Sequence, residues 1–319
     1  MENTGMSSYV SSAFSALRFF KDYAVAAGSY LMASKGHKAM PTLTHIDSIT
    51  RLSPLVIRVL GQNPGPFTLQ GTNTYIVGNG PRRILIDTGE PNIEKYLTEL
   101  KEALDGAEIE YIVITHWHHD HTGGIPGVVE HVVGKKIPIY KVQRTGNGED
   151  TSLFEYVDDG KSISVDGATL RFIYTPGHTV DHSALWLEEE KALFSGDCIL
   201  GEGTTVFEDL HSYMDSLKKI RNLEATRIYP GHGPVIEKVN DKVDEYISHR
   251  QKREDEIVNV LRNNESISSM DITNAVYEGT PLSVRLAALN NVRLVLNKLQ
   301  KDGVVQKVGF ELYSYSAKL

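Results

Sequence analysis

Residues 115–121 read Thr-His-Trp-His-His-Asp-His and directly follow the short apolar run Tyr111–Ile114. Such a run is typical of a buried strand. Four metal-binding types of side chain therefore lie within six residues of one strand end: His116, His118, Asp120 and His121. His116 and His118 are two residues apart, so both can face one point while the other two side chains turn toward a second point. A solvated histidine tract would leave the aspartate and the strand unexplained, so the pattern predicts a metal site.

The same design recurs three times further along the chain, as a strand, a turn with glycine and then a ligand-type residue. His178 ends Tyr174-Thr-Pro-Gly-His, Asp197 ends Phe194-Ser-Gly-Asp, and His232 ends Tyr229-Pro-Gly-His. With the first cluster these residues make a set of seven. Imidazole and carboxylate ligands without thiolate suit Zn²⁺, and also Mn²⁺ or Fe²⁺. We expect two divalent ions per chain, with zinc as the first choice.

Composition excludes several classes of protein. The 319 residues include one cysteine, Cys198, so the chain has no internal disulfide and no zinc site made of several cysteines. The hydrophobic fraction of 40% and the charged fraction of 23% are those of a globular protein. No apolar stretch is long enough to span a membrane, so we expect no membrane partner. The net charge of −8 repels a polyanion on average, so bound metal or local positive charge would have to attract nucleic acid.

The order of expected elements indicates an α/β domain followed by a helical module. Strands are expected at 55–60, 74–77, 84–86, 111–114, 169–174, 184–187 and 192–195, with helices at 93–104 and 212–222. Helices at 241–261, 272–276 and 282–299 and a hairpin over 304–315 then follow in the order of a winged helix. We therefore expect an N-terminal extension over residues 1–45, a metal domain over 46–246 and a winged-helix-like α+β domain over 247–319.

The N-terminal extension is free of acidic residues from Asn3 to Lys21 and is rich in serine and alanine. Arg18 and Lys21 interrupt its apolar residues, so it is a poor secretory signal but is typical of a mitochondrial transit segment. A peripheral helical extension is the alternative, and Met40 is a second possible start. We expect a mitochondrial matrix location rather than a cytoplasmic one.

These motifs together resemble the metallo-β-lactamase superfamily. The resemblance rests on His116-x-His-x-Asp-His121 with His178, Asp197 and His232 in that order, and on the turn Asp87-Thr-Gly89. The phrases Asn63–Tyr75, Ser195–Asp209, Tyr229–Val235 and Tyr246–Arg250 are most similar to the β-lactamase-like protein 2 subfamily, a set of mitochondrial endoribonucleases. This resemblance implies a four-layer αββα sandwich with a C-terminal winged helix.

The resemblance also implies roles for individual residues. His116, His118 and His178 would hold one metal, Asp120, His121 and His232 the other, and Asp197 would bridge them. Asp87 would hold a ligand in place. Asp120 and His182 are the expected catalytic residues, although His182 is equally explained as a satisfied core histidine. His119 is expected to be a spacer.

The implied activity is hydrolysis by a hydroxide that bridges the two metals. The metal ligands alone do not show which kind of bond is hydrolysed. We expect a phosphodiester of single-stranded RNA, with a glutathione thioester as the alternative. A β-lactam is disfavoured because Asp197 stands where several true β-lactamases carry cysteine. A non-enzymatic docking protein is disfavoured by the complete ligand set.

The C-terminal domain carries a small excess of basic residues and is the expected RNA-binding part. Arg250 and Arg253 are the expected substrate-binding residues, although the same cations would also suit the carboxylates of glutathione. Tyr313 can either stack on an unpaired base or pack within its hairpin.

Overall fold

The computed structural model describes residues 43–144, 152–279 and 281–316. The chain divides into two compact units, one ending at Gln251 and the other beginning at Lys252. Nearly all of the extension predicted over residues 1–45, including the expected transit segment, lies outside the described residues.

A seven-stranded sheet forms one half of the larger unit, with its strands in sequence order from β1 to β7. Their bounds are β1 Ile49–Arg51, β2 Val56–Leu60, β3 Asn73–Val77, β4 Arg82–Ile86, β5 Glu108–Val113, β6 Ile139–Lys141 and β7 Glu155–Tyr156. Strands β4 to β7 pair in parallel, so β4, β5 and β6 all end at one edge. The residues that follow β4 and β5 therefore meet at that edge. Asp87 follows β4 and the His116 cluster follows β5, so the two lie close together.

A five-stranded sheet forms the other half, in the order β12-β11-β10-β9-β8. Its strands are β8 Ser162–Val165, β9 Ala168–Tyr174, β10 Ser183–Leu187, β11 Ala192–Gly196 and β12 Arg227–Pro230. Strands β11 and β12 are parallel neighbours, so the segments carrying Asp197 and His232 leave the sheet side by side.

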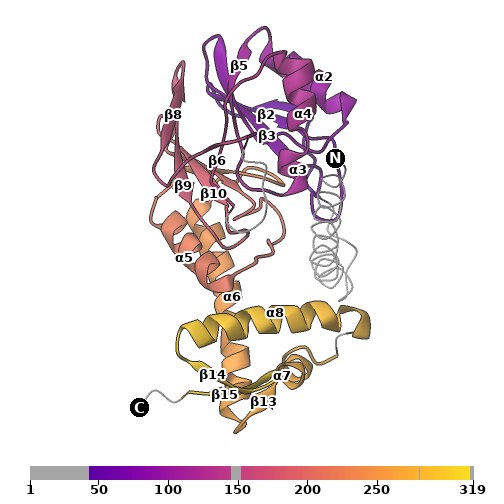
Figure 1. The fold of residues 1–319 in the computed structure, drawn as a ribbon, viewed down its shortest axis with the longest axis vertical. Helices are drawn as coiled ribbons and strands as arrows, with labels where there is room; N and C mark the ends of the chain where they lie inside the picture. The colour runs from indigo at the N-terminus through magenta and orange to yellow at the C-terminus, as the bar shows by residue number, and fades with distance from the viewer. Residues whose placement is uncertain (1–42, 145–151, 280, 317–319) are drawn as a thin grey trace, which may run out of the picture. The chain divides into compact units, whose positions relative to one another are not determined.

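The inner strands are buried on both faces, which explains why they are apolar throughout rather than alternating. Ile84 and Ile86 of β4 face the core between the two sheets, together with Phe172 and Phe194 of the second sheet. Leu85 faces the opposite side and packs in a second core with helix α2. The sheets and helices therefore form the α/β sandwich that the resemblance implied (Figure 1).

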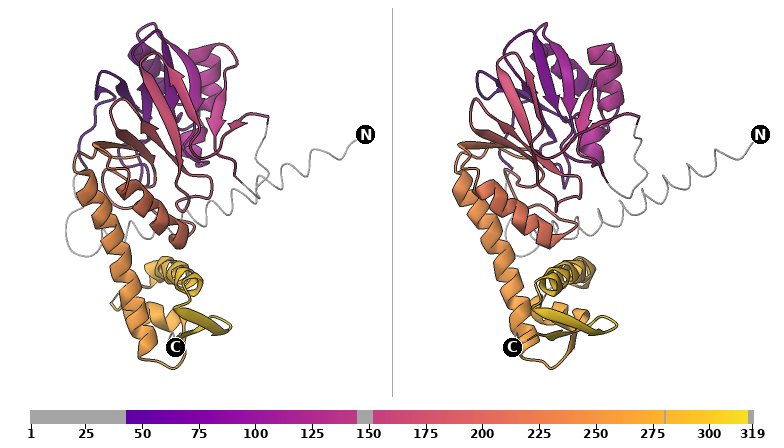
Figure 2. Two further views of the ribbon diagram at one scale, coloured as in Figure 1. Left: turned by 90° about the vertical axis from the view of Figure 1, so that its left-hand side faces the viewer. Right: turned by 60° about the vertical axis from the view of Figure 1, so that its left-hand side comes forward.

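Helices flank the sheets of the larger unit (Figure 2). Their bounds are α2 Glu94–Leu104, α3 His119–Thr122, α4 Ile125–Val128, the π-helix η1 Val129–Val133 and α5 Leu210–Arg221. The next helix, α6 Val239–Arg262, belongs to the larger unit up to Gln251 and to the smaller unit from Lys252. In the parts of the chain that the structure describes, no helix combines the length and the apolar character needed to cross a membrane.

The smaller unit contains the predicted winged helix. After the end of α6 it comprises β13 Ile267–Ser268, α7 Ser269–Val276, α8 Leu282–Lys301, β14 Val305–Gly309 and β15 Leu312–Tyr315. The three strands form one sheet in the order β13-β15-β14. Tyr313 is buried within it, which favours packing over base stacking for this residue.

A buried ion pair connects the two sheets of the larger unit. Lys141 ends β6 in the first sheet, and its Nζ lies 2.6 Å from Oδ2 of Asp181, in the segment between β9 and β10 of the second. Both side chains are fully buried. Lys141 Nζ also donates to the carbonyl of Val142. The pair therefore fixes the segment that carries His178 and His182.

We expect Lys141→Met to lower the free energy of unfolding by roughly 3–5 kcal/mol, because it leaves the buried Asp181 carboxylate without its partner. The double variant Lys141→Met/Asp181→Leu should recover most of this loss. Lys219→Met is the matched control. It breaks the solvent-exposed pair with Asp159 and should cost about 1 kcal/mol or less. Urea unfolding of the metal-free proteins measures all three. A double variant as unstable as the single one would show that the two charges are not coupled.

Candidate metal centre

The seven predicted ligands meet where the strands that precede them end. His116, His118, Asp120 and His121 follow β5, His178 follows β9, Asp197 follows β11 and His232 follows β12. They form two groups: His116, His118, His178 and Asp197 in the first, and Asp120, His121 and His232 in the second. The resemblance implied the same two sets of ligands, with Asp197 as a bridge between them and not as a member of the first set.

The donor atoms of the first group are close to one another. His116 Nε2 lies 2.9 Å from His118 Nδ1, and His178 Nε2 lies 3.2 and 3.1 Å from these two atoms. Two atoms bound to one zinc ion at about 2.0–2.1 Å each can be at most about 4.2 Å apart. All three separations meet this condition, so the histidines can share one ion.

The second group is equally compact. Asp120 Oδ2 lies 3.2 Å from both His121 Nε2 and His232 Nε2. Asp197 faces both groups with different oxygens. Its Oδ1 lies 3.4 Å from His121 Nε2 and 3.3 Å from His232 Nε2, while its Oδ2 lies 3.7 Å from His178 Nε2 and 4.0 Å from His116 Nε2. Asp197 therefore has the geometry of a bridging carboxylate.

Two of these donor atoms show that the site is built for cations. His121 Nε2 and Asp197 Oδ1 are buried and have no hydrogen-bond partner. An unpaired buried polar atom is costly, so each one in a native protein requires an explanation. A metal ion that accepts a lone pair from each atom provides it.

Hydrogen bonds fix the direction of the histidine rings. His178 Nδ1 lies 2.8 Å from the carbonyl of Val206, and His232 Nδ1 lies 3.3 Å from that of Gly71. A carbonyl only accepts, so each Nδ1 carries a proton and each Nε2 is the ring atom that faces the site. Neither carbonyl could be predicted from the sequence, because every residue has a backbone carbonyl and the residue type does not show which one accepts.

Asp87 supports both groups of ligands, in the role that the resemblance implied. Its Oδ2 accepts from His121 Nδ1 at 2.7 Å and from Thr115 Oγ1 at 2.9 Å. Thr115 Oγ1 in turn lies 2.9 Å from His116 Nδ1. Asp87 has a left-handed backbone, with φ of 57°, which costs free energy outside glycine and marks a position held by its surroundings. Thr115 is a positioning residue that the sequence analysis missed, although it stands first in the decisive stretch.

The chain matches the Metallo-beta-lactamase superfamily over residues 67–232 and the Beta-lactamase associated winged helix domain over residues 268–311. The chain belongs to the metallo-beta-lactamase superfamily. This is a fold of metal-dependent hydrolases, and the His and Asp groups indicate that the chain binds divalent metal.

Relatives of this superfamily match along most of the chain. The beta-lactamase-like protein 2 homolog of Caenorhabditis elegans is 63% identical over 279 residues, which are 86% of this chain and 94% of that protein. The Drosophila melanogaster homolog of the same name is 44% identical over 85% of this chain and 97% of its own.

Solved structures show the same fold at low identity. A beta-lactamase domain protein from Burkholderia ambifaria has a TM-score of 0.71 at 17% identity, covering 86% of this chain and 95% of its own. A metallo-beta-lactamase family protein from Thermus thermophilus has a TM-score of 0.64 at 22% identity, covering 83% of this chain and 100% of its own.

The surroundings of His182 favour the core-histidine alternative, with a positioning role, over the catalytic role that was also predicted for it. Its side chain is fully buried. Its Nδ1 lies 2.9 Å from Thr175 Oγ1, and its Nε2 accepts from the backbone N–H of Asp197 at 3.2 Å. Burial, followed by the charge of His178, lowers the pKa of His182 to about 3. Both ring nitrogens are occupied, so His182 orients Asp197 and has no proton to give to a substrate.

Arg250 is also not the substrate-binding residue that the sequence predicted. It is buried and donates to Thr204 Oγ1 and to the carbonyl of Thr205. Its guanidinium lies 4.9 Å from the centre of the Phe207 ring. Arg250 therefore holds the segment whose Val206 carbonyl orients His178. Its position on a charged helix gave no sign that it would be buried.

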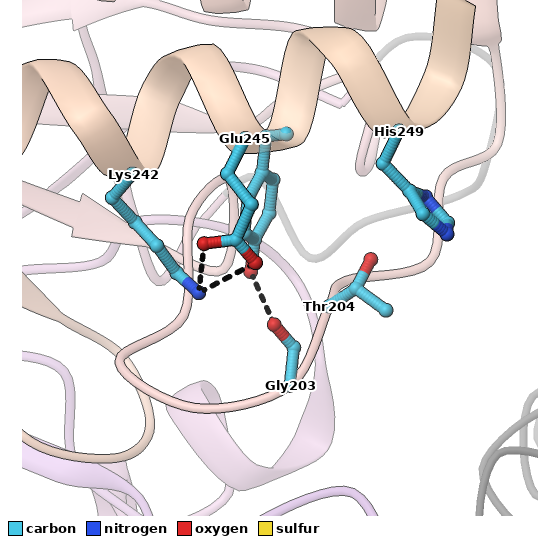
Figure 3. A pocket seen from close by; sticks show the side chains of 6 residues that line it. Gly203, Thr204, Lys242, Glu245 and His249 are labelled. Carbon is cyan, nitrogen blue, oxygen red and sulfur yellow. Dashed lines mark hydrogen bonds and ion pairs between the residues drawn. The ribbon is translucent and has the colours of Figure 1, made fainter. Parts of the chain in front are cut away.

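Helix α6 holds the same segment at a second point. Tyr246 donates to the carbonyl of Gly203, and Lys242 forms an ion pair with Glu245 beside it. A pocket of about 300 Å³ lies here, with Thr204 and His249 also on its wall (Figure 3). Arg253, the other predicted substrate contact, lies in the smaller unit, where it pairs with Glu256 at 2.7 Å and lies over Tyr277.

The two groups of ligands differ in protonation when metal is absent. Burial and the neighbouring histidines lower the pKa of His116 and of His118 well below the ordinary value, so both rings are neutral. Burial alone would also lower the pKa of His232, but the carboxylates of Asp197 and Asp120 outweigh it and raise the pKa to about 10. The pKa of His121 is likewise raised well above its ordinary value, since Asp120, Asp87 and Asp197 outweigh burial.

We expect His121 and His232 of the second group to release protons when that group binds an ion, whereas His116 and His118 of the first group should release none. At pH 7 His121 and His232 are protonated, so a cation must displace about two protons. The affinity of the second group should therefore rise with pH between about 6 and 9. Titration calorimetry with Zn²⁺ at pH 7, in buffers of different ionisation enthalpy, measures the release for each ion. Asp120→Asn should reduce the release, and equal release at both groups would contradict this account.

Proposed function

We propose that the chain is an endoribonuclease that hydrolyses phosphodiester bonds of single-stranded RNA with two zinc ions. The observation that carries the proposal is a similarity that spans the metal centre and the winged helix together. The relative at 63% identity matches over 94% of its own length. Its name is that of the β-lactamase-like protein 2 subfamily, which the sequence resembles and whose members are endoribonucleases. The seven residues to which that resemblance assigns the metals form two groups that could hold metal ions, which supports the proposal.

The chemistry of the site supports hydrolysis. Two divalent ions, when bound, lower the pKa of a water and stabilise negative charge on a phosphoryl oxygen. Asp197 holds the two groups at a fixed separation. Asp120 accepts from Thr72 Oγ1 at 3.1 Å and keeps 18% of its side chain exposed. Its pKa is lowered well below the ordinary value, since the nearby His121 and His232 outweigh burial. An ionised carboxylate in this position can accept the proton of the attacking water.

Hydrolysis of a glutathione thioester is the alternative, because the same ions would stabilise a carbonyl oxygen. The burial of Arg250 does not favour one substrate over the other. It removes a predicted contact for the RNA backbone and for the glutathione carboxylates alike. Arg253 stays a predicted substrate contact.

We expect the metal-loaded protein to cut a labelled single-stranded RNA and to lose this activity with a chelator. His118→Ala should reduce cleavage to background, because the first group then lacks a ligand. The matched control is His211→Ala, which removes an exposed histidine of α5 and should leave the rate unchanged. A glutathione thioester is assayed in parallel. Fast thioester turnover without RNA cleavage would overturn the proposal in favour of the alternative.

We also propose that residues 1–40 direct the protein to the mitochondrial matrix. A reporter fused to this segment should be imported, because its stretch from Asn3 to Lys21 is basic and free of acidic residues, as import requires. Changing Arg18 and Lys21 to Glu should leave the reporter in the cytosol. A reporter that stays cytosolic with the native segment would refute import by these residues.

A further inference from the structure

Arg144 lies beside two of the segments that carry ligands of the first group. The carbon of its guanidinium lies 3.7 Å from the centre of the Trp117 ring, and Trp117 stands between His116 and His118. On its other side, an Arg144 nitrogen lies 3.5 Å from Oε1 of Glu208. The backbone N–H of Glu208 donates to the carbonyls of Gly177 and His178.

The buried ion pair of Lys141 explains why Arg144 is placed there. Lys141 is paired with Asp181, in the segment that also carries His178, and Arg144 follows Lys141 by only three residues. The chain therefore leaves β6 toward the first group of ligands. Arg144 keeps 17% of its side chain exposed and Glu208 keeps 36%, so the pair is partly accessible to a ligand.

Two exposed apolar residues lie close to Glu208 through the backbone: Val180 contacts it, and Val206 precedes it by two residues in the chain. Val206 is 42% exposed and Val180 is 39% exposed. The backbone N–H of Val180 donates to Oε2 of Glu208, and the Val206 carbonyl accepts from His178. Large exposed apolar residues beside a cationic group give a surface that is suited to a charged ligand with an apolar part.

We propose that Arg144, Trp117, Val180 and Val206 form a subsite for the nucleotide next to the scissile phosphate. This inference rests on the proposed function. The Arg144 guanidinium binds the neighbouring phosphate in place of the Glu208 carboxylate, and Trp117 holds the guanidinium flat by stacking on it. The two valines contact the ribose or base. Glu208 competes with the phosphate for Arg144, which lowers the affinity of the subsite for RNA. When no RNA is bound, Glu208 holds the Arg144 side chain in position.

We test the subsite with a single-stranded RNA oligonucleotide and with bis(p-nitrophenyl) phosphate, a small phosphodiester that has no neighbouring nucleotide. Arg144→Ala should raise KM for RNA about tenfold to a hundredfold, since it removes a hydrogen-bonded charge. The kcat for RNA should change little, because this contact exists before and during the reaction. The slope of log KM against log salt should fall by about 0.7, the value for one phosphate contact on a single strand. Turnover of the small phosphodiester and the metal content should not change.

Three further variants separate substrate binding from a purely structural role. Glu208→Gln removes the competing charge and should lower KM for RNA, whereas a structural link between Arg144 and Glu208 would make both variants harmful. Arg144→Lys should restore the salt slope and part of the affinity. Arg171→Ala is the matched control, because it breaks the comparable pair with Glu188 and should leave KM unchanged.

The outcomes are distinguishable. If wild-type protein turns over the small phosphodiester but does not cut RNA, the proposed function fails, and the subsite fails with it. If wild-type protein cuts RNA and Arg144→Ala keeps its KM, only the subsite is wrong. Loss of metal or of small-substrate turnover in Arg144→Ala, with no gain in Glu208→Gln, would show a structural role and would also overturn the subsite.

Discussion

The rest of the metal centre depends on the carboxylate of Asp197, because its two oxygens serve different groups of ligands. Oδ1 faces His121 and His232, and Oδ2 faces His116 and His178. A carboxylate spans a short distance, so both groups must be brought to it closely. The fold does this by ending β5, β9, β11 and β12 around one point. The parallel pairs β4–β5 and β11–β12 are what direct successive strand ends to the same edge.

Buried charge outside the ligand set keeps these segments in position. Asp87 is matched by hydrogen bonds from Thr115 and His121, and Asp181 is matched by Lys141. Removing one partner of such a buried pair costs more than the pair contributes when intact, so each pair strongly favours a single arrangement. His182 adds a neutral contact to the backbone of Asp197. The side chains around the ligands thus serve mainly to orient them. Substrate contacts are therefore expected on the exposed side of the first group, near Arg144.

The order of the strands and helices and the seven candidate ligands could be predicted from the sequence because both depend on local patterns, whereas the four-layer sandwich and the division of the ligands came from the resemblance. Strand and helix periods set the elements, and residue types with turns set the seven ligands. The short elements β1, β6, β7, β8, β13, α3 and α4 were not predicted, since a few residues carry little periodicity. The sequence analysis was wrong about Arg250 and left two roles open for His182, because burial and hydrogen-bond partners are decided by distant segments: residues 204–207 cover Arg250, and Thr175 and Asp197 occupy His182. Arg144 was missed for the same reason, as its partners Trp117 and Glu208 are far from it in the chain.

The most direct test of this account is the metal content of the Asp197→Ala variant beside that of the wild-type protein. Both are reconstituted with zinc, freed of loosely bound ions and analysed for metal per chain, with Asp215→Ala of the exposed surface of α5 as a control. The account predicts two ions per chain in the wild-type protein and in the control. It predicts that Asp197→Ala loses tight binding at both groups together, because one side chain completes both. Two tightly held ions in Asp197→Ala, or fewer than two in the reconstituted wild-type protein, would contradict it.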